Sequence, residues 1–383
     1  MIQFDFSKCG LDQKELDATA PALLRAHQAL EKEKSLGEIG WWQLPTQPAV
    51  KNISKRFDNW VVLGIGGSSQ GAKALVEALL PPQPTAKLFV LESPDPVSVG
   101  HLLANIDLSR TGFNVVSKSG ESVETLALFD YFQKLVESQV GSKWREHFVV
   151  TTGKGKGKLF ALAEKEKLCL LEVPENVGGR FSVFSAVGLF PFACAGGDVE
   201  GLLKGAQNAL KRCSVSNVDE NPAYKNGAAH FLLNKNHGKT ISVMIPYGDA
   251  LKEFGGWTAQ LWAESLGKGG EGQTPLVAVG PQAQHWLGQL LLDGPKDKVV
   301  TFVTVEAGKK NPFGPLLKQE QVAFAKALEE VGCPSITLSL SRLDAETVGE
   351  LLMTYQVQTA FTGHLMGVNP YNQPAVERIK KLL

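Results

Sequence analysis

Short apolar runs alternate with glycine- or serine-rich turns and helical stretches along this 383-residue chain, and this alternation is its most constraining feature. Five such runs lie in residues 60–67, 87–96, 112–120, 147–155 and 168–179. Their β-branched and apolar residues are typical of buried strands. Strands that alternate with helices predict a parallel sheet covered on both faces, which is an α/β fold.

The alternation starts again after a helical region around 198–236. Four further candidate strands lie in residues 239–249, 274–281, 298–306 and 335–341. A chain of this length ordinarily divides into more than one domain. We therefore expect two α/β domains, with a boundary near 195–215, and the following ranges: 1–50 (an N-terminal helical segment), 51–200, 201–360 and 361–383 (a C-terminal helical segment).

The charge and cysteine content exclude several classes of protein. Lys and Arg together number 39 and balance 39 Asp and Glu, so no net field recruits nucleic acid or an anionic membrane. Five scattered cysteines lack the spacing of a metal or redox pair, which favours a reducing compartment. No signal peptide or apolar stretch of about 20 residues is visible. We expect a cytoplasmic protein whose partner is a small molecule.

Two strand-to-helix turns have the composition of anion-binding loops. The turn at 64–69 is rich in glycine and leads into a helix near Gly71, but it has Ser69 where a dinucleotide fingerprint needs its third glycine. The turn at 117–125 offers three serine hydroxyls and a lysine at a helix start, a pattern that suits a phosphomonoester. The plainer alternatives are a tight turn without a ligand and serines that only cap a helix.

Glu264 lies on an apolar helical face, because Trp257 and Leu261 precede it at helical spacing. Removal of water favours the protonated form of such a carboxylate, and a carboxyl group near neutrality can move a proton from a carbon next to a carbonyl. This is the demand of aldose–ketose interconversion. The alternative is an ion pair with Lys268 on a solvated face.

Three basic residues are further candidates. Arg180 follows two glycines and precedes an apolar run, so we expect it to project from a close-approach turn at a helix start. A guanidinium there can stabilise an enediolate or pair structurally with a carboxylate. His285 is one of seven histidines and is by itself more typical of a core or surface residue. Lys380 lies in a C-terminal helix that begins near Pro374, and such a lysine commonly only favours the helix end.

Taken together, six blocks in order resemble the glucose-6-phosphate isomerase family from about residue 60 to the C-terminus. They are GIGGSSQGAKAL, VVSKSGESVET, ENVGGRFSVFSAVGL, FGGWTAQLWAESLGK, QAQHWLGQ and GVNPYNQPAVERIKK. The resemblance implies two sugar-isomerase domains of flavodoxin-like, three-layer αβα type with mostly parallel sheets. It also implies an active site between them that the second subunit of a homodimer completes.

The resemblance also assigns roles to individual residues. Glu264 is the base that moves a proton between C2 and C1, Arg180 stabilises the cis-enediolate, and His285, from the neighbouring subunit, opens the sugar ring with Lys380. No metal or organic cofactor is needed. The residues that it implies in substrate binding are Gly67, Ser68, Ser117, the Lys118 backbone, Ser119, Ser122 and Glu124.

Two departures accompany the resemblance. Glu121 replaces a residue that is usually a hydroxyl in the phosphate loop, where a negative side chain that faced the ligand would weaken binding. The chain is also short, which puts the dimer contacts in question. The alternatives to a glucose-6-phosphate isomerase are a dual glucose/mannose-6-phosphate isomerase, a non-catalytic phosphosugar-binding regulator, and a nicotinamide-dependent enzyme that uses Glu92 as its ribose contact.

Overall fold

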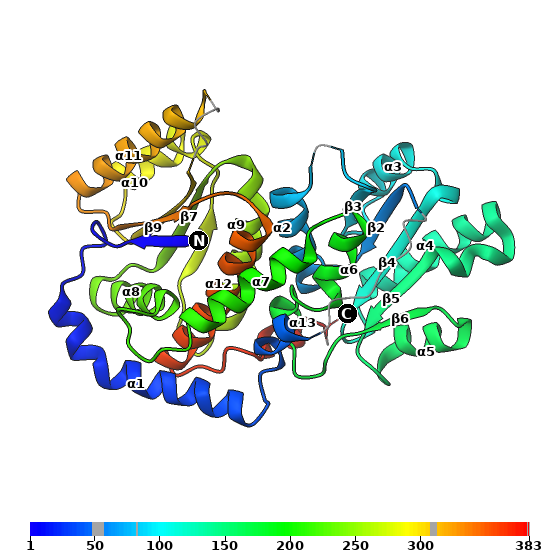
Figure 1. The fold of residues 1–383 in the computed structure, drawn as a ribbon, viewed down its shortest axis with the longest axis horizontal. Coiled ribbons are helices and arrows are strands. Elements are labelled where there is room, and N and C mark those ends of the chain that lie inside the picture. Colours follow the sequence, from blue (N-terminus) through cyan, green and yellow to red (C-terminus); the bar gives the residue numbers. More distant parts are fainter. Residues whose placement is uncertain (48–56, 82, 307–311, 381, 383) are drawn as a thin grey trace. The chain divides into compact units, whose positions relative to one another are not determined.

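The computed structural model describes residues 1–47, 57–81, 83–306, 312–380 and 382. The chain separates into two compact units. We call Gly37–Glu200 the continuous unit, and Met1–Leu36 with Gly201–Leu383 the composite unit. Each unit is an α/β layer structure in Figure 1.

The described part of the continuous unit contains a five-stranded parallel sheet. Its strand order is β3-β2-β4-β5-β6, and all five predicted strands of this half of the chain are confirmed. The central strands are buried throughout, as expected when helices cover both faces of a parallel sheet. The strands are β2 (Asn59–Leu63), β3 (Lys87–Leu91), β4 (Thr111–Ser117), β5 (Phe148–Thr152) and β6 (Cys169–Glu172).

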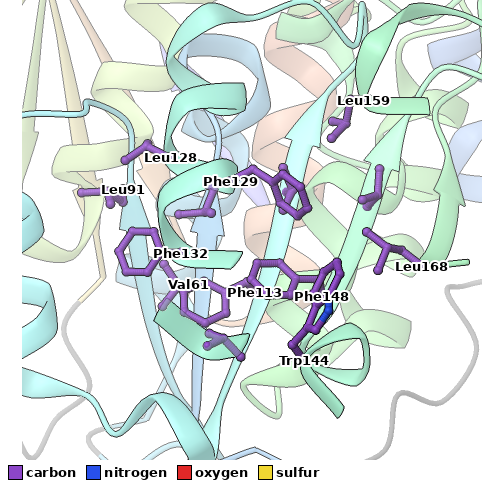
Figure 2. Packing of buried hydrophobic residues seen from close by; sticks show 14 of the residues in the cluster. Val61, Leu91, Phe113, Leu128, Phe129, Phe132, Trp144, Phe148, Leu159 and Leu168 are labelled. Atoms are coloured by element: carbon purple, nitrogen blue, oxygen red, sulfur yellow. The ribbon is translucent and has the colours of Figure 1, made fainter. Parts of the chain in front are cut away.

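Side chains alternate between the two faces of this sheet and build a core on each. On one face Phe113 stacks on Phe148 with ring centroids 5.1 Å apart, and Phe129 and Phe132 of α4 pack over them (Figure 2). On the other face Trp60 packs against α6. The helices are α2 (Gln70–Leu79), α3 (Pro96–Asn105), α4 (Val123–Val140), α5 (Gly157–Glu166) and α6 (Ala186–Cys194).

The strand order reverses at β2, which has β3 on one side and β4 on the other. In open α/β sheets a crevice forms at such a reversal, outside the carboxyl ends of the strands, and ligands bind there. The two loops at this position are 64–69, after β2, and 118–122, after β4. They are the two loops that the sequence marks as anion-binding candidates.

The composite unit has a similar five-stranded sheet, but one of its outer strands is antiparallel to its neighbour. Among its described residues the sheet order is β1-β10-β9-β7-β8, where the last four strands are parallel and β1 is antiparallel to β10. All four predicted strands are confirmed, but β1 was not predicted, and residues 1–36 therefore group with the second α/β unit. The strands are β1 (Ile2–Asp5), β7 (Ile241–Tyr247), β8 (Thr274–Val277), β9 (Lys298–Val305) and β10 (Ser335–Leu340).

Helices cover both faces of the second sheet. Leu291 of α10 and Leu328 of α11 pack on Val300 and Phe302, whereas α8, α9 and α12 lie on the other face. The helices are α1 (Gln13–Ser35), α7 (Val199–Arg212), α8 (Pro222–His237), α9 (Lys252–Leu266), α10 (Leu287–Asp293), α11 (Gly314–Glu330), α12 (Ala345–Leu365) and α13 (Pro374–Lys380).

Short 3₁₀ turns connect several of these elements. They are η1 (Gly40–Trp42), η2 (Leu44–Thr46), η3 (Gly66–Ser68), η4 (Leu108–Arg110), η5 (Gly141–His147), η6 (Gly179–Phe181), η7 (Asp249–Leu251) and η8 (Gln282–His285). The predicted fold class is confirmed: both units are layered α/β structures with mostly parallel sheets, flanked by α1 and α13. Within the described ranges, no helix has the length and apolar character that a membrane span requires.

Candidate active site

Ser117 and Ser122 face each other across the loop that follows β4. Ser117 is the last residue of β4 and is 1% exposed, and its Oγ lies 2.9 Å from Oγ of Ser122. Ser122 is the N-cap residue of α4, yet within the described structure its hydroxyl makes no capping bond to the helix. The alternative that these serines serve only as caps therefore does not account for Ser122. Both hydroxyls lie beside the first turn of α4, where unpaired N–H groups favour an anion.

The rest of this loop is held by backbone contacts and by Lys118. The Lys118 carbonyl accepts from the N–H of Gly153, at 3.1 Å, and the Ser119 Oγ accepts from the N–H of Glu121, at 3.2 Å. The Lys118 ammonium donates to the carbonyl of Glu175, 2.9 Å away. Burial lowers the pKa of Lys118, with smaller contributions from neighbouring charges. The lysine thus ties the loop 118–122, which we call the serine loop, to the segment that leads to Arg180.

The loop after β2 approaches the same segment at Gly67. A Cβ at Gly67 would lie 2.4 Å from the carbonyl carbon of Gly179 and 2.7 Å from the nitrogen of Arg180, so only glycine fits. Ser68 ends the 3₁₀ turn η3 in this loop. The structure therefore brings Gly67, Ser68, Lys118 and Arg180 together by their loops.

Glu92 is occupied by this same loop. Its carboxylate accepts from Ser69 Oγ at 2.5 Å and from Gln70 Nε2 at 3.2 Å, and it pairs with Lys73 at 3.1 Å. These three partners fix the start of α2. A carboxylate held in this way does not support the nicotinamide alternative, in which Glu92 would be the ribose contact.

Arg180 lies in the short 3₁₀ turn η6, directly after the glycine pair that approaches Gly67 closely, as expected for a close-approach turn at a helix start. The next helix, α6, begins at Ala186, where the Ser185 hydroxyl accepts from the N–H of Val187. Arg180 is 2% exposed, and its guanidinium carbon lies 5.6 Å from the centre of the Phe181 ring. Burial and stacking hold the guanidinium in one position.

Two buried polar atoms adjoin the two loops. The Gln70 Oε1, at the start of α2, and the Thr125 Oγ1, in the first turn of α4, have no hydrogen-bond partner among the described residues. Buried polar atoms are ordinarily paired, with protein or with another molecule. Glu124 lies in the same first turn of α4. The edge of the sheet between the loops is thus polar and under-satisfied.

Glu264 belongs to the composite unit and lies near the carboxyl end of α9. Trp257 and Leu261 are 2% and 0% exposed, which confirms the apolar face on which Glu264 was predicted, and Glu264 itself is half-buried. Its Oε2 accepts from Nε2 of Gln260 at 3.1 Å. Sequence analysis missed Gln260, although its place one turn before Glu264 on the same helix was a usable signal.

His285 and Glu264 lie at opposite edges of the second sheet. His285 is exposed in η8, beyond the carboxyl end of β8, where Gly280 still pairs with Tyr247. Glu264 lies twelve residues along α9 from Lys252, about 18 Å toward the amino edge of the same sheet. One composite unit therefore does not bring these two residues together.

The segment that leads to Lys380 meets the end of α9. Lys268 donates to the carbonyl of Asn369 at 2.6 Å, and Trp262 and Leu266 pack against Met366. Lys380 is the last residue of α13, and its side chain lies outside the described residues.

The chemistry of the described side chains is that of acids, bases and hydroxyls. No group of three or more His, Cys, Asp or Glu in the described ranges could hold a metal ion. All five cysteines are described and are free thiols. Burial raises the pKa of Cys213 to about 12, so this thiol stays protonated.

Comparisons with known proteins place the chain in a family. A family model described as phosphoglucose isomerase matches residues 40–311. A probable glucose-6-phosphate isomerase from Methanococcus maripaludis is 38% identical over 375 residues, covering 92% of this chain and 85% of that protein.

Two solved structures share the fold over the whole chain. A hypothetical protein from Thermus thermophilus matches with a TM-score of 0.89 at 32% identity, covering 100% of this chain and 98% of that one. A glucose-6-phosphate isomerase from Chlamydia trachomatis matches with a TM-score of 0.86 at 22% identity, covering 100% and 87%. The family model and the 38% identical relative together show that the chain belongs to the phosphoglucose isomerase family.

Proposed function

We propose that this chain interconverts glucose 6-phosphate and fructose 6-phosphate. The observation that carries the proposal is the Ser117–Ser122 hydroxyl pair, which lies at the strand-order reversal beside the first turn of α4. Hydroxyls and helix N–H groups there can bind several oxygens of a phosphomonoester. The choice of sugar is supported by relatives at 34–39% identity that are named glucose-6-phosphate isomerase or probable glucose-6-phosphate isomerase.

The isomerisation itself falls to Glu264 and Arg180. The Glu264 carboxylate takes the proton from C2 of the open-chain aldose, and the electron pair moves through C1 onto the carbonyl oxygen to give a cis-enediolate. The Arg180 guanidinium stabilises that negative charge. A proton shifts between O1 and O2, and Glu264 returns its proton to C1, which gives the ketose.

Phosphate and sugar are held by the continuous unit. We assign the phosphate to Ser117, Ser119, Ser122 and the Lys118 backbone, and the sugar hydroxyls to Gly67 and Ser68. Glu124, in the first turn of α4, is the remaining proposed substrate-binding residue. In this proposal the continuous unit binds the substrate, and the composite unit supplies the base for proton transfer.

Ring opening requires a proton donor and acceptor near the ring oxygen and the C1 hydroxyl, and we assign these roles to His285 and Lys380. His285 lies at the opposite edge of the second sheet from Glu264 of its own chain. We therefore propose a homodimer in which each site takes His285 from the partner subunit. We further propose a place in glycolysis and gluconeogenesis in the cytoplasm, which five free thiols support.

The direct test is turnover of fructose 6-phosphate by the purified protein in the presence of EDTA, with glucose 6-phosphate measured by a coupled dehydrogenase. Mannose 6-phosphate serves as the parallel substrate. Conversion between the glucose and fructose phosphates alone supports the proposal, and turnover of mannose 6-phosphate as well would broaden it to the dual isomerase. Phosphosugar binding without any turnover would overturn it in favour of a regulator.

Mixed dimers test the donation of His285. If Glu264→Gln and His285→Ala chains mix at random, half of the dimers are hybrids, and one of the two sites in each hybrid has both residues. We expect about a quarter of wild-type activity per chain to return on mixing two inactive variants. Glu264→Gln mixed with Arg180→Ala is the control, because Arg180 acts within its own chain. No gain beyond that control would show that His285 does not act across subunits.

A further inference from the structure

The serine loop rests on the start of α5, a helix with no assigned part in the reaction. The N–H of Leu159 donates to the carbonyl of Gly120 at 3.0 Å. A Cβ at Gly157 would lie 2.3 Å from the Ser119 carbonyl oxygen, so the two backbones are in direct contact. Gly120 and Gly157 both have positive φ, at 69° and 82°, and this contact depends on glycine at both positions.

Glu121 joins the same two segments through its side chain. Its Oε1 accepts from the N–H of Lys158, the second residue of α5, at 2.9 Å. The N-cap position of α5 is Lys156, a side chain that cannot accept a hydrogen bond, and in the described structure it makes no cap bond. The carboxylate of Glu121 thus supplies from another loop the cap that the helix lacks at its own N-cap.

This contact also determines where the negative charge of Glu121 lies. The carboxylate Oε1 lies at the positive end of the α5 dipole, and Oε2 lies 3.4 Å from Nζ of Lys158. The charge is therefore balanced by α5 and its lysine. The concern that Glu121 would repel a bound phosphate applies only to a side chain turned toward the ligand.

We propose that Glu121 is a positioning residue for phosphate binding, which caps α5 and thereby fixes the serine loop. The inference rests on the proposed function, because it names the support of the same phosphate site. Ser119, Gly120 and Ser122 are neighbours of Glu121 in the loop, so release of its carboxylate frees the segment that holds the phosphate. Loss of the brace should therefore weaken binding and leave proton transfer almost unchanged.

Three variants separate the cap from the charge. Glu121→Ala removes both, Glu121→Gln keeps an acceptor for the Lys158 N–H but removes the charge, and Lys158→Met keeps that N–H but removes the ion pair. We expect Glu121→Ala to raise KM for fructose 6-phosphate about fivefold with kcat within twofold, the scale of a lost helix cap. The other two variants should stay within twofold of wild type.

The inhibition or dissociation constant of inorganic phosphate gives a readout independent of turnover. This constant should be about fivefold higher in Glu121→Ala than in wild type and close to the wild-type value in Glu121→Gln. The amides of Lys158 and Leu159 should also exchange faster in Glu121→Ala. Tighter phosphate binding in both Glu121 variants would show that the charge repels the ligand and would overturn the inference. Lower thermal stability with unchanged phosphate affinity would overturn it too, because the role would then be structural only. If the wild type binds phosphate but turns over no sugar, the proposed function is wrong. The phosphate dissociation constants of wild type and the Glu121 variants would still decide the role of Glu121.

Discussion

Four parallel strands follow the same order in both units, β3-β2-β4-β5 in one and β8-β7-β9-β10 in the other, but the candidate site residues lie at different places relative to this order. In the continuous unit the loops at the strand-order reversal carry Gly67, Ser117 and Ser122, which is where the topology of an open α/β sheet places a ligand. In the composite unit the corresponding reversal lies between β7 and β9, yet Glu264 lies near the far end of α9. Strand order therefore locates the proposed binding residues of the first unit and does not locate the proposed base in the second.

The comparison teaches that equal topology does not imply equal use. A phosphate site needs many backbone donors, which loops and helix starts at a sheet edge supply. A proton-transfer base needs one carboxylate in a defined place, and a half-buried position beside an apolar helical face can supply that. The predictions below test this division, from the largest expected effect to the smallest.

Removal of the base should separate chemistry from binding. Glu264→Gln keeps the size of the side chain and its contact with Gln260 but cannot take a proton. We expect kcat to fall about 10³-fold, or about 4 kcal/mol in the barrier, with the affinity for inorganic phosphate unchanged. Steady-state kinetics and phosphate titration measure both.

Glu346→Gln is the matched control for that experiment, because Glu346 is a carboxylate of the same unit that pairs with Lys204 and Asn208 far along the chain from the site residues. It should keep wild-type turnover. If Glu264→Gln also turned over normally, the assignment of the base to the composite unit would be wrong.

A buried histidine should make the composite unit the acid-sensitive one. Burial lowers the pKa of His230 to about 4, and its Nδ1 donates to Gln273 Oε1 at 3.2 Å, which assigns the neutral tautomer. Because the folded-state pKa lies below the ordinary 6.5, the unfolded chain binds more protons between pH 6.5 and 4. The free energy of unfolding should therefore fall by about 3 kcal/mol as the pH drops through that window.

The measurement is urea unfolding at several pH values, for wild type and for His230→Gln, which keeps a donor for Gln273. The variant should have a lower free energy of unfolding than wild type near neutral pH, but that free energy should fall less when the pH is lowered. His101→Gln, at an exposed position of the continuous unit, is the control and should follow wild type. If the free energy of unfolding fell with pH equally steeply in wild type and in His230→Gln, His230 would not be the cause of the acid sensitivity.

The alternation of apolar runs and turns predicted nine of the ten described strands, because each of them is a short, mainly apolar run next to a turn. The signal is clearest in central strands such as β2, β4 and β5, which are buried on both faces. The exception, β1, is four residues long and is a strand only because it pairs with β10, more than 300 residues away. A short run of mixed polarity has no local signal that distinguishes it from a coil.

In the candidate site, too, local sequence patterns were informative and long-range contacts were not predicted. Gly67, Ser117, Ser122 and Glu264 lie on the elements where the sequence placed them, because each belongs to a local turn or helical pattern. The apolar run that begins at Phe181 did not locate the start of α6, which is set at Ala186 by the Ser185 cap. The contact between Glu121 and the N–H of Lys158 could not be predicted, since it joins residues 37 positions apart through the packing of two loops.

The smallest of the three effects is expected for Ser117→Ala in the continuous unit. This variant should weaken phosphate binding more than turnover, which is the reverse of the effect expected for Glu264→Gln. Ser117→Ala removes one hydroxyl from the pair at the end of β4, and a hydrogen bond to a charged group contributes about 1.5–3 kcal/mol. We expect KM for fructose 6-phosphate and the inhibition constant of inorganic phosphate to rise together, about 10- to 100-fold, with a smaller change in kcat.

Ser138→Ala, in the exposed last turns of α4, removes a hydroxyl far from the start of that helix and from the loop after β4, and should change neither constant. A Ser117→Ala variant that lost kcat but kept its phosphate affinity would place this hydroxyl at the reacting carbons. The continuous unit would then share in the chemistry, and the division between a binding unit and a proton-transfer unit would not hold.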